Sequence, residues 1–313
     1  MENLAKNILI PLDGSKNALK SLDYLDLMFG PKHNLYVTLL YIWPLLPPVL
    51  TDEKTMDKEI WVKLTTVEKK NVLMAERILA VGKTALVKKG FDEKRIIELH
   101  QRQKVGIAQD ICNWANREKT DAVLLTRRGR TDLETLFMGG ISDKLVNYCG
   151  NYPVWIAGGG IHEKKVLVGV DASENALRAV DHAGFMLSGT DCLVTLFHTV
   201  KHLRHFVPME VLEGAEELQE LWKNKAAEQI APYMEKARGI LLNAGLTEEQ
   251  IAVKIVDGSR SGADDILKEA RDNGYGTIVL GRHGQSVMKQ FIFGSVTSKV
   301  IHLSAGLAIW IVQ

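Results

Sequence analysis

The fold is decided by a stretch of sequence that occurs twice, as Asn7–Ser15 (NILIPLDGS) and as Lys165–Ser173 (KVLVGVDAS). Each copy is a short apolar run followed directly by Asp-x-Ser. A short run rich in Val, Ile and Leu is typical of a strand covered on both faces, as strands of parallel sheets are. The polar residues at its end predict a turn into a helix, with Ser15 or Ser173 as the N-cap.

The similarity between the two halves continues along the chain. Ala122–Gly129 (AVLLTRRG) resembles Thr277–Gly284 (TIVLGRHG), and Pro153–Ile156 (PVWI) resembles Ala308–Ile311 (AIWI). Such self-similarity indicates two copies of one structural unit.

The boundary between the copies is expected at the three successive glycines of residues 158–160, which provide a flexible joint. We predict one domain at residues 1–157 and a second at 164–313. Domains of about 150 residues are of ordinary size.

Short apolar runs and longer periodic segments alternate within each half. In the second half we expect strands at 166–170, 193–199, 251–256, 277–280 and 308–312. Helices are expected at 176–187, 209–243, 263–273 and 296–303, with Pro232 kinking or dividing the second of them. This alternation predicts an α/β fold in which each half is an open parallel sheet flanked by helices.

Composition and charge exclude several classes of function. The chain has 39 basic and 38 acidic residues, so no net field draws it to nucleic acid or to an anionic membrane. No run of about 18 apolar residues is present, so no membrane span is expected. Cys112, Cys149 and Cys192 lie far apart without CxxC spacing, and we expect reduced thiols and a cytoplasmic protein.

A cluster of glycines and hydroxyl residues in the second half indicates a phosphate site. Gly281 and Gly284 follow the fourth expected strand, and Gly294–Ser295 opens the last expected helix. Glycines let the backbone approach a ligand, and amides at a helix N-terminus favour an anion. In an open α/β sheet the ligand lies beyond the carboxyl ends of the strands, where Asp171 is also expected.

Together with the Asp-x-Ser after the first strand, this spacing resembles the ATP-binding pattern of the universal stress protein family. The resemblance covers essentially the whole chain as two tandem Rossmann-like domains of the HUP type, each with five strands in the order 3-2-1-4-5. It implies a nucleotide site made by Val170, Asp171, Thr199, Leu280, Gly281, His283, Gly284, Gly294, Ser295, Val296 and Thr297. It also implies Mg²⁺ bridging the phosphates, with no metal held by protein ligands alone.

The first half departs from the pattern at two positions. Thr126 stands where the second half has Gly281, and Gly140 stands where it has Ser295. We therefore expect the first site to be empty or weak. The positions of this degenerate site are Asp13, Thr126, Gly129, Gly139, Gly140 and Ser142.

These features favour a non-enzymatic, ATP-binding regulatory protein of the stress response, with no catalytic residues. Two alternatives remain open, a slow Mg²⁺-dependent ATPase and a ligand-free scaffold. ATP, ADP and AMP are not distinguished, because backbone cradles read phosphate more than base. The expected partners are an adenine nucleotide and an unidentified protein, and the resemblance implies an intramolecular pseudo-dimer, leaving open a further dimer of chains.

Overall fold

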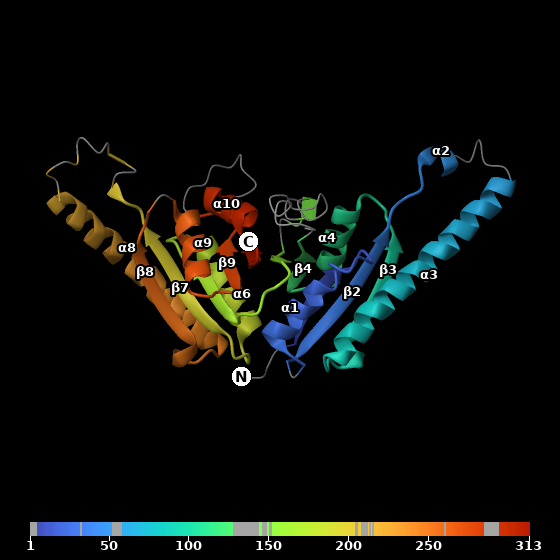
Figure 1. Cartoon of the computed structure of the whole chain (residues 1–313), viewed down its shortest axis with the longest axis horizontal. Helices are drawn as coiled ribbons and strands as arrows, with labels where there is room; N and C mark the ends of the chain where they lie inside the picture. Colours follow the sequence, from blue (N-terminus) through green and yellow to red (C-terminus); the bar gives the residue numbers. More distant parts are fainter. Residues whose placement is uncertain are drawn as a thin grey trace. The chain divides into compact units, whose positions relative to one another are not determined.

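The computed structural model describes residues 5–31, 33–51, 58–127, 144–145, 149, 152–203, 206–207, 212, 214, 216–259, 261–284 and 294–313. These residues form two compact units. The first unit contains residues 5–127 and 144–154, and the second contains Trp155–Gln313. Each unit is built on a sheet whose central strands are parallel, with helices against it (Figure 1).

The first unit alternates strands and helices as the sequence predicts. Its main elements are β1 (Lys6–Pro11), α1 (Lys20–Phe29), β2 (Leu35–Trp43), α2 (Pro48–Thr51), α3 (Lys58–Lys88), β3 (Ile96–Arg102), α4 (Ile107–Arg117) and β4 (Ala122–Thr126). The strands lie in the order β3-β2-β1-β4, and neighbouring strands are parallel.

The second unit repeats this pattern. Its main elements are β5 (Val154–Ala157), β6 (Lys165–Gly169), α6 (Glu174–Leu187), β7 (Leu193–Val200), α8 (Glu216–Ala244), β8 (Ile251–Asp257), α9 (Gly262–Asp272), β9 (Thr277–Gly281), α10 (Ser295–Leu303) and β10 (Ala308–Val312). Its strands lie in the order β8-β7-β6-β9-β10, with β5 beyond β10. The α/β class is confirmed, and in this unit so is the strand order 3-2-1-4-5.

Helix α8 is continuous through Pro232, so the proline does not divide it. The proline is exposed. The helix therefore continues over the face of the sheet as one element.

The core of each unit consists of its central strands. Ile8, Leu9 and Ile10 of β1 are fully buried, and so are Val166, Leu167 and Val168 of β6. Runs of successive buried residues are expected only for strands covered on both faces. Because neighbouring central strands are parallel, their carboxyl ends lie at the same edge of each sheet.

Two tryptophans stack in the core of the second unit. The rings of Trp155 and Trp310 lie 3.8 Å apart and within 3° of parallel. His182 of α6 meets both rings edge-on, and its Nε2 accepts a hydrogen bond from Trp155 Nε1 at 3.1 Å. Complete burial lowers the pKa of His182 to about 3, so the ring is neutral at pH 7.

The prediction of three reduced thiols is wrong for two of the cysteines. Cys112 of α4 and Cys149 form a disulfide, with their Cα atoms 5.2 Å apart, and Cys192 is free and buried. A separation of 37 residues gives no local signal for pairing, because α4 is brought to Cys149 by tertiary packing.

Among the helices in the described ranges, none is both long enough and apolar enough to cross a membrane.

Candidate nucleotide-binding site

The site is centred on the carboxyl ends of β6 and β9, which are paired parallel neighbours. Asp171 follows β6 and is partly buried. Its Oδ1 accepts hydrogen bonds from Ser173 N at 3.1 Å and from the Ser173 hydroxyl. The Ser173 oxygen accepts in turn from Ala176 N at 3.2 Å, which makes it the predicted N-cap of α6. The sequence motif Asp-x-Ser thus turns the chain from β6 into α6.

Asp171 and Gly284 lie in direct contact. A Cβ on Gly284 would lie 2.5 Å from Asp171 Oδ2, so any side chain at position 284 would displace the carboxylate. The structure therefore brings the first-strand Asp and the fourth-strand glycines to one place, although 113 residues separate Asp171 from Gly284 (284 − 171).

The glycine at 281 is required by the protein's own helix. A Cβ there would lie 2.8 Å from both the carbonyl carbon and oxygen of Asn175, in the first turn of α6. The sequence-based reason for this glycine, close approach of a ligand, is therefore not the one that the structure gives.

The first unit shows what a side chain at this position does. Thr126 occupies the equivalent of Gly281, and its hydroxyl lies 3.4 Å from the carbonyl oxygen of Ala18. Helix α1 begins seven residues after Asp13 (20 − 13), whereas α6 begins three residues after Asp171 (174 − 171). Helix α1 therefore lacks the first turn that α6 has. Ser15 accepts from Ala18 N but does not cap α1, whose N-cap is Leu19, so the predicted N-cap role of Ser15 is wrong.

The start of α10 lies against the end of β9. Gly294 N donates to Arg282 O at 2.9 Å, and a Cβ on Gly294 would lie 3.4 Å from Gly284 N. No side chain caps this end of α10, and its first turn carries no acidic residue. The first amides of a helix have no intrahelical acceptor and carry a partial positive charge. This helix end is therefore suited to an anion.

Thr297 fastens α10 to the sheet. Its side chain is buried, with 4% exposed, and its hydroxyl donates to the carbonyl oxygen of Gly281 at 2.8 Å. Ser295 is exposed and Val296 is half-buried beside it. The hydroxyl proton of Thr297 is thus engaged by the protein, and Ser295 is the residue of this turn that faces solvent.

The strand ends beside Asp171 provide an apolar floor with polar edges. Val170 and Leu280 are buried, with 3% and 4% exposed. Thr199 at the end of β7 donates to Asp265 Oδ2 at 2.8 Å, and Asp265 also accepts from Ser259 N at 3.0 Å. Asp265 therefore holds the loop after β8 against the end of β7.

The sequence-based site did not include His198 or Asp265. Nδ1 of His198 lies 2.7 Å from Val170 O, and burial lowers the pKa of the imidazole despite the nearby Asp171 carboxylate. The register pairs Gly169 with Phe197, so the residue after Phe197 comes opposite Val170. No feature of the sequence predicts the place of His198, because this register is set by the pairing of β6 with β7. The place of Asp265 could have been predicted from the repeat, since Asp110 occupies the equivalent place in α4 and accepts from Lys104 N at 2.7 Å.

Positive charge near the glycines is desolvated. Arg282 is 9% exposed, and burial lowers the pKa of its guanidinium. Burial, followed by the charge of Arg282, lowers the pKa of His283, so its imidazole is neutral at pH 7. His283 can therefore act as a neutral donor or acceptor.

Asp13 is the other described member of the degenerate site. Its Oδ1 accepts from Ser15 N at 3.0 Å, as Asp171 does from Ser173. The remaining predicted members lie outside the described residues: Gly129, Gly139, Gly140 and Ser142.

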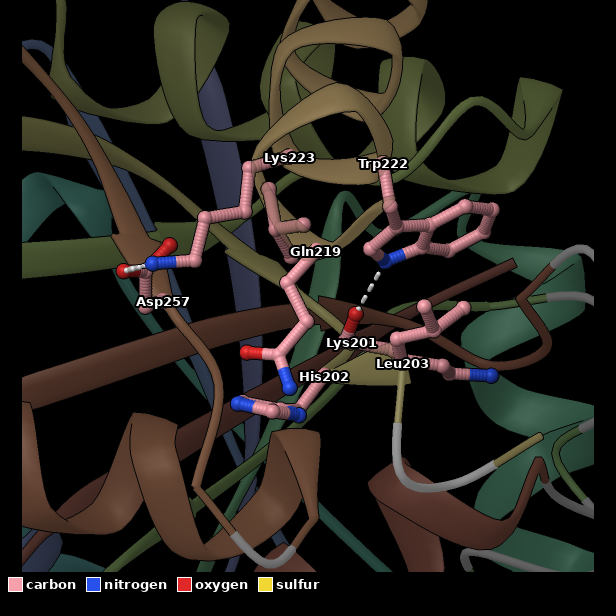
Figure 2. A pocket seen from close by; sticks show the side chains of 8 residues that line it. Lys201, His202, Leu203, Gln219, Trp222, Lys223 and Asp257 are labelled. Atoms are coloured by element: carbon pink, nitrogen blue, oxygen red, sulfur yellow. Dashed lines mark hydrogen bonds and ion pairs between the residues drawn. The ribbon is translucent and has the colours of Figure 1, made fainter. Parts of the chain in front are cut away.

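A small cavity lies beyond the end of β7, at the start of α8 (Figure 2). Trp222 Nε1 donates to Lys201 O at 2.7 Å, and Lys223 Nζ donates to Asp257 Oδ2 at 2.5 Å. The cavity holds about 10 Å³, room for about one water molecule, so it does not accommodate a nucleotide base. Across the described ranges, no group of three His, Cys, Asp or Glu side chains is arranged to hold a metal ion.

The family model and the similar proteins of known sequence point to the same protein family. The model of the universal stress protein family matches residues 5–157 and 163–306. Universal stress protein MJ0577 of Methanocaldococcus jannaschii is 29% identical over 150 residues, which are 45% of this chain and 90% of that protein.

Solved structures share the fold over nearly the whole chain. A universal stress protein from Archaeoglobus fulgidus DSM 4304 is similar with a TM-score of 0.60 at 18% identity, covering 97% of each chain. A putative universal stress protein from Pseudomonas aeruginosa UCBPP-PA14 has a TM-score of 0.54 at 16% identity, covering 99% of this chain and 93% of its own. At these identities the likeness concerns the fold.

Proposed function

The chain belongs to the universal stress protein family, and from this premise we propose that its second unit binds ATP or another adenine nucleotide. The nucleotide lies at the carboxyl ends of β6 and β9, and the protein acts as a regulatory binder in the stress response. The observation that carries the proposal is the N-terminus of α10, uncapped and held beside Asp171 and Gly284.

The first turn of α10 binds the phosphates. Main-chain amides of Ser295, Val296 and Thr297 lie at a helix end where an anion is stabilised by the partial charges of the helix. The buried Thr297 bond to Gly281 O supports this role, because it fixes the helix end relative to the strand. Mg²⁺ binds together with the phosphates. Phosphate oxygens and water molecules supply most of its ligands.

The nucleoside lies against the strand ends. Val170 and Leu280 offer an apolar surface for the base, and the Asp171 carboxylate accepts from ribose hydroxyls. Gly284 leaves the Asp171 carboxylate and the neighbouring main chain open to the ribose, because a side chain at that position would displace the carboxylate. The hydrogen bond from Thr199 to Asp265 fixes the end of β7 beside this apolar surface.

The first unit binds nucleotide weakly or not at all. Thr126 replaces Gly281, and α1 lacks the first turn that α6 presents beside the site. We therefore propose one nucleotide per chain.

Isothermal titration with ATP and Mg²⁺ tests both statements, using Gly294→Val and its counterpart in the first half, Gly139→Val. Gly294 has φ −63°, so a side chain is compatible with its backbone, and it obstructs the amides instead of unfolding the turn. We expect one site per chain, a loss of more than about tenfold in affinity for Gly294→Val, or about 1.4 kcal/mol, and no change for Gly139→Val. Two equivalent sites, or an unchanged dissociation constant in Gly294→Val, would refute the proposal.

A further inference from the structure

Helix α3 carries an exposed patch that is apolar at its centre and basic around it. Leu73 and Met74 are adjacent in the sequence and are 54% and 52% exposed. The exposed Lys69, Lys70 and Arg77 surround them at spacings of three and four residues, which places all five on one face of the helix. The exposed Glu76 lies on the same face, so three basic residues stand beside one acidic residue. We call Lys69, Lys70, Leu73, Met74 and Arg77 the basic patch.

Helix α8 carries a patch of the opposite charge. Leu218 and Leu221 are 48% and 55% exposed. Glu217 and Glu220 are exposed beside them, again at helical spacing. We call these four residues the acidic patch.

The charges of the two patches take no part in ion pairs within the described parts of the chain. Other charged side chains on the same helices do: Lys83 of α3 bonds Glu93 at 3.0 Å, and Lys225 of α8 bonds Glu228 at 2.8 Å. The chain thus leaves opposite charges unpaired around two exposed apolar centres.

We propose that the basic patch of one chain binds the acidic patch of a second copy of this chain. Leu73 and Met74 then lie against Leu218 and Leu221, and the lysines and Arg77 lie against Glu217 and Glu220. This arrangement removes four exposed apolar side chains from water and pairs the surrounding charges.

The acidic patch decides between a second copy and other occupants. An anionic membrane would suit the basic patch alone and would leave the acidic patch without a partner. Pairing α3 with α3 of a second copy would bring like charges together. Binding of α3 to α8 satisfies both patches at once.

The contact is weak and sensitive to salt. Patches of four or five residues are much smaller than the roughly 800 Å² per partner of a stable interface. Exposed ion pairs contribute little and are screened by salt. Because the two patches differ, the contact is heterologous, and association continues as the concentration rises.

Sedimentation velocity on the full chain tests the proposal. At about 50 mM salt the weight-average mass should rise with protein concentration, and at about 500 mM it should return to that of a single chain. Lys69→Glu with Lys70→Glu reverses one patch, and Glu217→Lys with Glu220→Lys reverses the other. Each double variant alone should stay a single chain at low salt, because its two patches then repel.

An equimolar mixture of the two double variants should regain association, because each reversed patch then meets an opposite one. Lys16→Glu with Lys20→Glu makes the same change of charge at exposed positions outside the patch and should associate like the wild type. A wild-type mass that is independent of concentration at low salt overturns the proposal. So does a mixture that stays at the single-chain mass. Binding of the wild type to phosphatidylglycerol vesicles without self-association would assign the basic patch to a membrane instead.

Discussion

Gly281 lacks a side chain because α6 begins against it. The carbonyl oxygen of Asn175 lies 2.8 Å from where a Cβ would be, and backbone atoms cannot yield as a flexible side chain can. In the first unit Thr126 stands at the position of Gly281, and α1 begins later after its strand than α6 does. The residue at this position and the start of the helix beside it therefore differ together between the two units.

Gly281→Ala should lower the free energy of unfolding by about 1–3 kcal/mol, as overpacking of a close contact does. Chemical denaturation followed by circular dichroism measures it. Gly239→Ala is the matched control, because no atom lies within 4 Å of its added Cβ and α8 gains a better helix former. Equal stability of Gly281→Ala and wild type would contradict the contact with Asn175.

The residue scale also shows the limit of sequence-based prediction. Gly281, Gly284 and Asp171 could be assigned to one site because their spacing follows the strand ends. The reason for Gly281 could not, since the approach of α6 is a tertiary contact. The bond from Thr297 to Gly281 O and the position of His198 likewise depend on how strands and helices meet.

At the scale of elements, strands were predictable because each is a short apolar run that ends at a polar residue. Predicted strand 308–312 coincides with β10, and the four others of the second half agree to within one residue at each end. The start of α1 and the pairing of Cys112 with Cys149 were missed. Both depend on side chains from distant segments, Thr126 in one case and α4 in the other.

The hydrogen bond between Trp155 of β5 and His182 of α6 should make the free energy of unfolding of the second unit depend on pH. His182 accepts from Trp155 Nε1, so protonation of Nε2 would remove that bond in a buried place. Its pKa is lowered to about 3, against an ordinary value of 6.5. The unfolded chain therefore binds a proton between these values and the folded one does not. The stability is fully present above pH 6.5 and is lost as the pH falls towards 3, by up to about 1.4 kcal/mol per pH unit.

Denaturation of the wild type and of His182→Gln across this pH range measures the effect. The glutamine amide oxygen can still accept from Trp155, but it does not titrate. The wild type should lose more stability than the variant on acidification, and parallel pH dependences would contradict the assignment to His182.

The disulfide between α4 and Cys149 should stabilise the first unit. Closing a loop of this length contributes on the order of 3–4 kcal/mol by restricting the unfolded chain. Reduction with dithiothreitol should therefore accelerate amide exchange in β1 to β4 of the wild type, but not in Cys112→Ser with Cys149→Ser. If mass spectrometry after alkylation of the unreduced, denatured protein finds three free thiols, the pairing is wrong.

On the scale of the whole molecule, duplication followed by divergence explains the chain. Both halves keep the Asp-x-Ser turn, with Asp13 and Asp171 each accepting from the serine two residues later. The second half keeps the glycine that lets its first helix begin early, and the first half does not. The two halves therefore share one architecture, and they differ at the sheet edge where we propose that the second half binds a nucleotide.

Amide hydrogen exchange at Ser295, Val296 and Thr297, resolved by NMR with and without saturating ATP and Mg²⁺, tests the central claim most directly. These first-turn amides have no intrahelical acceptor, so a bound polyphosphate supplies the partner that they lack. We predict that their exchange slows by about tenfold or more, corresponding to about 1.4 kcal/mol of protection. Unchanged exchange at all three amides under saturating ATP would contradict it.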